Sequence, residues 1–221
     1  METLIILIIL SFIIGSFPTG MIIAKIKGVN LRNIGSGNTG ATNVLRALGK
    51  EAALITLAVD ISKGIIPVII ARHLFSDIDI QVVQFAGIEN YITKPLIIIE
   101  GIAGLFAILG HNYSILLRFK GGKGVATSLG VLIAVSPHVA LITITIWMFV
   151  LARSGYSSLS SLIAFGLLPL SLYIADRSNE KIIIASVIVF LIVIRHLANI
   201  KRLINGTESK VFTKKKDAKP K

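Results

Sequence analysis

Long apolar runs alternate with short polar segments along most of this chain. Runs of about 20 residues with few charges are typical of membrane-crossing helices, because a helix rises about 1.5 Å per residue and the hydrocarbon core of a bilayer is about 30 Å thick. Runs of this kind lie at about 3–23, 52–74, 96–117, 158–174 and 181–197. We therefore expect an all-α integral membrane protein.

The stretch 122–152 is also apolar and has two interpretations. As one helix it would be about 45 Å long, which requires severe tilt, and Pro137 would remove a backbone donor from its middle. We expect two short spans that meet at Ser136, Pro137 and His138. The sequence then predicts seven transmembrane helices.

Composition supports a membrane domain. The chain is 54% hydrophobic with a mean hydropathy of +0.84, more than one soluble core of this length would bury. The absence of cysteine excludes disulfides and thiolate chemistry. The net charge of +12 comes from basic residues between and after the apolar runs, so nucleic acid is not an expected partner. We expect one membrane domain over 1–206 and a basic tail over 207–221.

Basic residues are distributed unequally between the two sides of this arrangement. One side holds most of them, whereas the other holds only Arg72, Lys94, Arg177 and Lys181. Cytoplasmic loops of membrane proteins are enriched in lysine and arginine. The sequence therefore predicts an outside N-terminus and a cytoplasmic C-terminus, with the unusual polar segments on the cytoplasmic face.

The first unusual polar segment is 32–46, which reads RNIGSGNTGATNVLR. Its glycines and hydroxyls are the groups that cradle a phosphate at a helix N-terminus, so Ser36, Gly37, Asn38 and Thr42 are candidate substrate contacts. The glycine spacing also matches a dinucleotide pattern, but no strand precedes it and no βαβ unit surrounds it. A flexible connecting loop is the simpler alternative.

The second segment, 119–128, reads FKGGKGVATS. It is similar to a P-loop but lacks that motif's opening glycine and its magnesium-binding hydroxyl, so an ATPase is not expected. A glycine turn with two lysines at a helix start still favours an anion, although it is also typical of a basic loop that sets topology. The candidate substrate-binding residues here are Gly121, Gly122, Lys123, Gly124 and the preceding His111.

The third segment follows the last span and reads RHLANIKRLINGTESK. His196 and Asn199 are three apart and share one helix face at the membrane boundary, although a lone histidine near a helix end is more often structural than catalytic. We expect Glu208 to make a structural pairing. Within 52–74, Asp60 and Lys63 predict an internal ion pair, with a substrate or proton path as the alternative.

The glycine-rich loops, with Arg46 and Lys123, suit a phosphorylated substrate, and the surrounding helices suit a long acyl chain. The histidines are scattered and no acidic cluster occupies the cytoplasmic loops, so neither a metal nor another cofactor is expected. A transporter of a phosphorylated solute is the main alternative. It would place polar groups on both faces, whereas the sequence predicts them on one.

The strings GSGNTGATNVLR, GHNYSILLRFKGGKGVATS and NIKRLINGTESK, in this order, resemble the three cytoplasmic motifs of bacterial acyl-phosphate:glycerol-3-phosphate acyltransferases, the PlsY family. The segments GSFP at 15–18 and DISKG at 60–64 also fit. The resemblance implies transfer of a fatty acyl group from acyl phosphate to the sn-1 hydroxyl of glycerol 3-phosphate. The products would be lysophosphatidic acid and phosphate, as the first step of phospholipid synthesis.

The same resemblance implies residue roles. Ser36 and Arg46 match the essential serine and arginine of the first motif, and Lys123 matches a site for the phosphate of glycerol 3-phosphate in the second. His196 and Asn199 match the catalytically important pair of the third motif.

Further implications concern Glu208, the partners and one departure from the family. Glu208 matches a glutamate that matters for structural integrity. The implied setting is the bacterial inner membrane, with the active site on the cytoplasmic face. The implied partners are glycerol 3-phosphate, acyl phosphate, membrane lipids and the enzyme that makes the acyl phosphate. The outside loop 75–95 is longer than the family usually has, and its Asp77, Asp79 and Glu89 are expected across the membrane from the site.

Overall fold

The computed structural model describes residues 1–76 and 95–211, and these are helical with no strand among them. The expected all-α class is confirmed. Most of the long loop expected over 75–95, with its Asp77, Asp79 and Glu89, and most of the basic tail lie outside the described residues. The helices are α1 (Glu2–Ser16), α2 (Thr19–Ile26), α3 (Ala41–Leu48), α4 (Lys50–Leu74), α6 (Pro95–Asn112), α7 (Val125–Val135), α8 (Pro137–Ser154), α9 (Ser157–Gly166), α10 (Leu168–Ala175) and α11 (Asn179–Ile204), with 3₁₀ turns η1 (Leu31–Asn33) and η2 (Ile115–Leu117).

Six stretches of the described residues are long and apolar enough to cross a membrane. They are Glu2–Ile26, Lys50–Leu74, Pro95–Leu117, Pro137–Ser154, Ser157–Ala175 and Asn179–Ile204. The break expected within 122–152 is present, since α7 ends at Val135 and α8 begins at Pro137. However, α7 has only 11 residues, about 16 Å of helix, so the expectation of seven transmembrane helices is not confirmed.

Two spans expected as single helices are each divided near a proline. Phe17 precedes Pro18 and has extended backbone angles (φ −61°, ψ 120°), so α1 ends and α2 begins afresh. Pro169 has no amide hydrogen to donate to the carbonyl of Phe165, and the chain breaks between α9 and α10 at Leu167. At each break the chain bends, but the helices on its two sides belong to the same candidate membrane span.

Small residues allow the central helices to pack closely. A Cβ atom added to Gly15 or Gly110 would overlap the backbone of the facing helix, at Ala107 in α6 or Phe12 in α1. A Cβ on Gly130 of α7 would likewise overlap the carbonyl of Ile61 in α4. Close backbone approach through small residues is the usual way helices associate within a membrane. The pairs α1–α6 and α4–α7 therefore pack backbone against backbone through these glycines.

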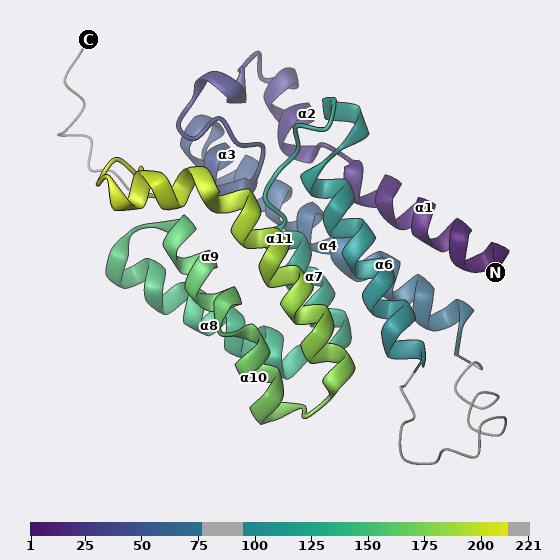
Figure 1. Ribbon diagram of the computed structural model, residues 1–221. Coiled ribbons are helices and arrows are strands. Elements are labelled where there is room, and N and C mark those ends of the chain that lie inside the picture. Colours follow the sequence, from purple (N-terminus) through teal and green to yellow (C-terminus); the bar gives the residue numbers. More distant parts are fainter. Residues whose placement is uncertain (77–94, 212–221) are drawn as a thin grey trace, which may run out of the picture.

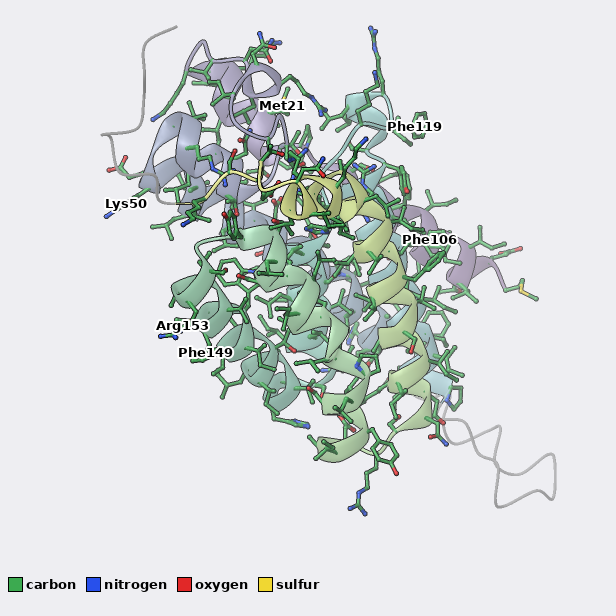
Figure 2. All side chains as sticks on the ribbon, turned by 60° about the vertical axis from the view of Figure 1, so that its left-hand side comes forward. Met21, Lys50, Phe106, Phe119, Phe149 and Arg153 are labelled. Atoms are coloured by element: carbon green, nitrogen blue, oxygen red, sulfur yellow. The ribbon has the colours of Figure 1, made fainter. Side chains whose placement is uncertain are left out.

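Apolar side chains cover both the interior and the outside of the bundle. The main buried cluster includes Val131, Phe165, Leu168, Leu172, Ile188 and Ile192. Figure 2 shows Phe149 of α8 pointing away from the bundle, and its side chain is 67% exposed. An outer surface rich in exposed isoleucine, leucine and phenylalanine suits contact with lipid chains.

The three polar motifs meet at one end of the molecule. Figure 1 shows α2, α3 and the C-terminal end of α11 gathered there, with the turn between α10 and α11 at the opposite end. Residues 207–211 turn back onto the bundle, where the amide of Val211 donates to the carbonyl of Gly155 (2.9 Å). The start of the predicted tail is thus part of the folded domain.

Candidate active site

A cavity of about 490 Å³ lies where the three motifs meet. Its polar lining comes from helix ends and loops, including Ser36, Arg46, Lys123, His196 and Asn199. Its apolar lining comes from the interior of the bundle and includes Leu57, Leu129, Ile144, Trp147 and Phe165. The cavity therefore joins a polar end to an apolar space between helices.

His196 is buried in α11 with one ring nitrogen engaged. Its Nδ1 lies 2.8 Å from the carbonyl oxygen of Ile192, and its exposed fraction is 2%. A carbonyl oxygen only accepts, so Nδ1 carries the hydrogen in this contact. The neutral imidazole therefore keeps the lone pair on Nε2, which can accept a hydrogen bond from a hydroxyl in the cavity.

Asn199, one turn further along α11, links two oppositely charged groups. The ammonium of Lys123 donates to Oδ1 of Asn199 (2.6 Å), and Nδ2 of Asn199 donates to Oε1 of Glu208 (2.6 Å). Both hydrogen bonds are charge-assisted, which makes them stronger than neutral ones. The amide orientation of Asn199 is therefore fixed, and with it the position of the Lys123 ammonium.

Glu208 accepts hydrogen bonds from two further side chains. Ser158 donates to its Oε1 (2.7 Å) and Arg202 donates to its Oε2 (2.7 Å). Burial raises the pKa of Glu208, but the hydrogen bonds from Ser158, Arg202 and Asn199 outweigh burial and hold the pKa below its ordinary value. Glu208 is thus a charged anchor that ties the segment after α11 to the cavity wall.

Lys123 and Arg46 bring positive charge to the polar end. Burial lowers the pKa of Lys123 to about 8, with Glu208 opposing the shift and neighbouring arginines adding to it. Arg46 donates from Nη2 to the carbonyl of Ser209 (3.1 Å), while its buried Nε has no protein partner among the described residues. A buried guanidinium hydrogen without a partner is costly. Arg46 also lines the cavity, where its positive charge suits an anionic ligand.

Asn43 holds the first motif loop in place. Its Oδ1 accepts from the amide of Ser36 (3.1 Å), and its Nδ2 donates to the carbonyls of Leu31 (3.2 Å) and Asn38 (2.9 Å). Asn43 is not among the residues predicted from the sequence. The available signal was a polar residue in the first turn of an amphipathic helix that follows a glycine-rich loop.

Thr42 and Asn38 line the cavity, whereas Gly37 does not belong to its lining. Thr42 Oγ1 lies 3.1 Å from the hydroxyl of Ser157. The amide of Gly37 donates to the carbonyl of Ile34 (3.0 Å), and its φ of +67° makes it a turn residue. The bare amide expected at Gly37 is therefore already used inside the loop.

The second motif differs from expectation in the same way. The amide of Gly121 donates to the carbonyl of Asn112 (3.2 Å) and that of Gly122 to the carbonyl of His111 (2.9 Å). Neither glycine belongs to the cavity lining, whereas Lys123 and Gly124 do. Gly121 and Gly122 are small because a Cβ on either would overlap His111. Their amides stabilise the loop instead of offering donors to a ligand.

Asp60 and Lys63 form the internal ion pair that the sequence predicts, and each residue is 3% exposed. His111 Nδ1 lies 3.7 Å from Asp60 Oδ1, and Lys63 lies over the ring of Phe17 (6.0 Å to its centroid). Asp60 and His111 both line the cavity. The pair thus supports the part of the cavity wall that α4 forms.

Comparison with known proteins identifies the family. Residues 5–206 match the family model described as glycerol-3-phosphate acyltransferase. A relative of that name from Geotalea daltonii is 43% identical over 209 residues, covering 95% of this chain and 98% of the relative. One from Aquifex aeolicus is 42% identical over 202 residues, covering 91% and 96%. The chain belongs to the glycerol-3-phosphate acyltransferase family.

Solved structures agree with this membership of the acyltransferase family. Crystal structures of PlsY (YgiH), described as an integral membrane glycerol 3-phosphate acyltransferase, share the fold. The glycerol 3-phosphate form has a TM-score of 0.82 and 41% identity, covering 96% of both chains. The lysophosphatidic acid form has a TM-score of 0.80 and 39% identity, covering 94% of this chain and 95% of the other. The resemblance drawn from the three motifs is confirmed.

The candidate site contains apolar residues that could not be predicted from the sequence. Trp147 lines the cavity and donates from Nε1 to the hydroxyl of Ser161 (3.1 Å), whereas Phe149, two positions along the same helix, faces outward. Both lie in one continuous apolar run, so hydrophobicity does not distinguish them. Only the packing of α8 against α9 decides which side chain faces the cavity.

Proposed function

We propose that this acyltransferase moves a fatty acyl group from acyl phosphate to the sn-1 hydroxyl of glycerol 3-phosphate, giving lysophosphatidic acid and phosphate. The observation that carries the proposal is one cavity with the cations Arg46 and Lys123 at its polar end and apolar side chains along the rest. The polar end suits two phosphate groups, and the apolar part suits an acyl chain.

Arg46 and Lys123 would hold the substrate phosphates. The unpartnered Nε of Arg46 and the ammonium of Lys123 offer charged donors from different elements. Gly124 caps the N-terminus of α7, whose dipole adds to the positive potential. Holding both phosphates side by side would bring the hydroxyl of glycerol 3-phosphate to the acyl carbonyl, an entropic gain that reaches several kcal/mol in good geometry.

In the chemical step, the hydroxyl oxygen bonds to the carbonyl carbon, and the bond from that carbon to the phosphate oxygen breaks. Inorganic phosphate leaves with the bonding electron pair. The hydroxyl proton passes to the phosphate of glycerol 3-phosphate, which is a weak base near neutral pH. Glu208, a carboxylate at the polar end beside α11, accepts from Ser158, Asn199 and Arg202 and is therefore a poor candidate base.

The contacts refine the roles of the catalytic candidates. The Nε2 lone pair of His196 can accept from the attacking hydroxyl and orient it, while the hydroxyl of Ser36 can donate to the developing oxyanion. Asn199 uses both ends of its amide on Lys123 and Glu208. We assign Asn199 to placing the Lys123 ammonium.

We also propose seven membrane crossings, with α7 as the short one, an outside N-terminus and a cytoplasmic C-terminus in the bacterial inner membrane. The exposed basic residues Lys25, Lys27, Lys50 and Lys120 belong to the segments at the motif end, which supports a cytoplasmic site. The 11 residues of α7 suffice if the loop before it descends below the membrane surface. Irregular backbone at that depth is tolerated where protein buries it, and Gly121 and Gly122 are buried.

Cysteine labelling tests the topology, because the chain has no cysteine of its own. Lys120→Cys in intact cells should resist a membrane-impermeant maleimide until the membrane is broken, whereas Arg177→Cys should react from outside. Reaction of Lys120→Cys in intact cells would place the site outside and contradict the proposal.

The reaction is tested with purified protein and labelled glycerol 3-phosphate. Palmitoyl phosphate, palmitoyl coenzyme A and palmitoyl acyl carrier protein are offered separately. We expect lysophosphatidic acid with palmitoyl phosphate alone. Product from a thioester only would refute the acyl phosphate donor while leaving the family intact. Uptake of glycerol 3-phosphate into proteoliposomes without acylation would favour the transporter alternative.

A further inference from the structure

Arg195, the residue before His196 in α11, makes three hydrogen bonds to the second motif loop. Its Nε donates to the carbonyl of Gly122 (3.0 Å), and its Nη2 donates to the carbonyls of Gly121 (3.2 Å) and Gly122 (2.9 Å). The same guanidinium lies over the ring of Tyr113, 5.1 Å from its centroid. One side chain thus binds two consecutive carbonyls and an aromatic face.

These contacts complete a two-sided attachment of the loop. On one side, the amides of Gly121 and Gly122 donate to carbonyls at the end of α6. On the other side, the carbonyls of the same two glycines accept from Arg195. Both glycines are buried, so without Arg195 their carbonyls would lose charged donors in a place that water reaches poorly.

The loop residue that follows is Lys123, and it is held from the same helix. Arg195 and Asn199 lie four residues apart on α11, so they share one face of the helix. Arg195 binds Gly122, and Asn199 binds the ammonium of Lys123 (2.6 Å). The backbone before Lys123 and the end of its side chain are therefore fixed by adjacent turns of one helix.

We propose that Arg195 is a positioning residue, which fixes the Gly121–Gly122 backbone so that Lys123 presents its ammonium to the phosphate of glycerol 3-phosphate. Arg195 is absent from the cavity lining and acts through Lys123. The assignment rests on the proposed function.

The contact requires arginine. A guanidinium is planar and presents its donors in a fixed fork, which matches two neighbouring carbonyls while its face stacks on Tyr113. A lysine ammonium keeps the charge but cannot reproduce the fork and the stacking together. Arg195→Lys therefore tests geometry at constant charge.

We expect Arg195→Lys to raise the KM for glycerol 3-phosphate by roughly 10- to 100-fold, the range for loss of charge-assisted hydrogen bonds. The KM for acyl phosphate should change little, whereas the thermal unfolding midpoint should fall because two buried carbonyls lose donors. Arg153→Lys is the matched control, because Arg153 is exposed and its label in Figure 2 stands at the edge of the bundle. That control should keep wild-type KM values.

A double-mutant cycle with Lys123→Ala separates positioning from general damage. If Arg195 acts through Lys123, then Arg195→Lys should raise the KM for glycerol 3-phosphate by less than about threefold when Lys123 is already alanine. The proposal would be overturned if the KM increases of the two single variants multiply in the double variant. It would also be overturned if Arg195→Lys has the same KM for glycerol 3-phosphate as Arg153→Lys. Wild-type protein that makes no lysophosphatidic acid would instead refute the proposed function.

Discussion

The charge state of Lys123 sets the pH range in which its side chain can bind a phosphate. Burial lowers its pKa to about 8, so the ammonium is intact at neutral pH and is lost as the pH rises through 8. We expect kcat/KM for glycerol 3-phosphate to fall above pH 8. A bound phosphate stabilises the charged lysine, so kcat should fall at higher pH than kcat/KM. Initial rates between pH 6 and 10 measure both profiles.

Substitution of Lys123 tests whether its side chain causes this alkaline fall in kcat/KM. Lys123→Arg keeps the charge throughout the range and should remove the fall near pH 8. Lys123→Ala should raise the KM for glycerol 3-phosphate by roughly 10- to 100-fold with a smaller effect on kcat. An alkaline limb that persists unchanged in Lys123→Arg would assign it to another group.

His196 provides a test of the base. With the substrate phosphate as the base, His196→Gln should slow the chemical step without abolishing it, because the glutamine carbonyl oxygen can still accept from the hydroxyl. Single-turnover measurement with both substrates bound isolates that step. Complete loss of chemistry in His196→Gln, with binding retained, would show that the imidazole itself takes the proton.

At the residue scale, the sequence indicated which polar side chains meet but not how their backbone is used. Ser36, Lys123 and His196 do line one cavity. The amides of Gly121 and Gly122 were expected to face a phosphate, yet they donate to α6. Hydrogen bonding of a loop amide depends on the facing helix, and no local sequence signal reports it.

At the element scale, the approach of α4 and α7 depends on glycine. A Cβ on Gly130 would overlap the carbonyl of Ile61, so Gly130→Ala should force the helices apart and destabilise the fold by about 1–3 kcal/mol. Gly166→Ala is the control, because nothing lies within 4 Å of a Cβ there. It should be neutral or stabilising by up to about 1 kcal/mol. Unfolding in detergent compares them, and equal stabilities would contradict the packing argument.

Helix boundaries were predictable where proline marks them. Pro137 gave the correct division between α7 and α8, and Pro18 and Pro169 carried the same signal at the two divisions that were missed. Apolar composition alone merges such pairs, because it measures the length of a run and not its backbone geometry. The face of α8 that meets the cavity could be identified only from the packed structure.

At the scale of the whole molecule, the segment 207–211 closes the site against Arg46 and the start of α9. Val211→Pro removes the amide that donates to Gly155, so we expect at least a tenfold loss of kcat/KM. Val211→Ala also removes the cavity-lining side chain but keeps the amide, and should lose much less. Equal activities of the two variants would show that this backbone contact is dispensable.

The same closure limits when the protein can work. Arg46 comes from the first quarter of the chain, whereas the carbonyls that hold it belong to Ser209 and Lys210, near the end. A nascent polypeptide in which Ser209 and Lys210 have not yet been made therefore lacks the groups that orient this guanidinium, however many helices it has already inserted. We expect a protease that removes residues 207–211 to silence a molecule whose bundle is otherwise intact.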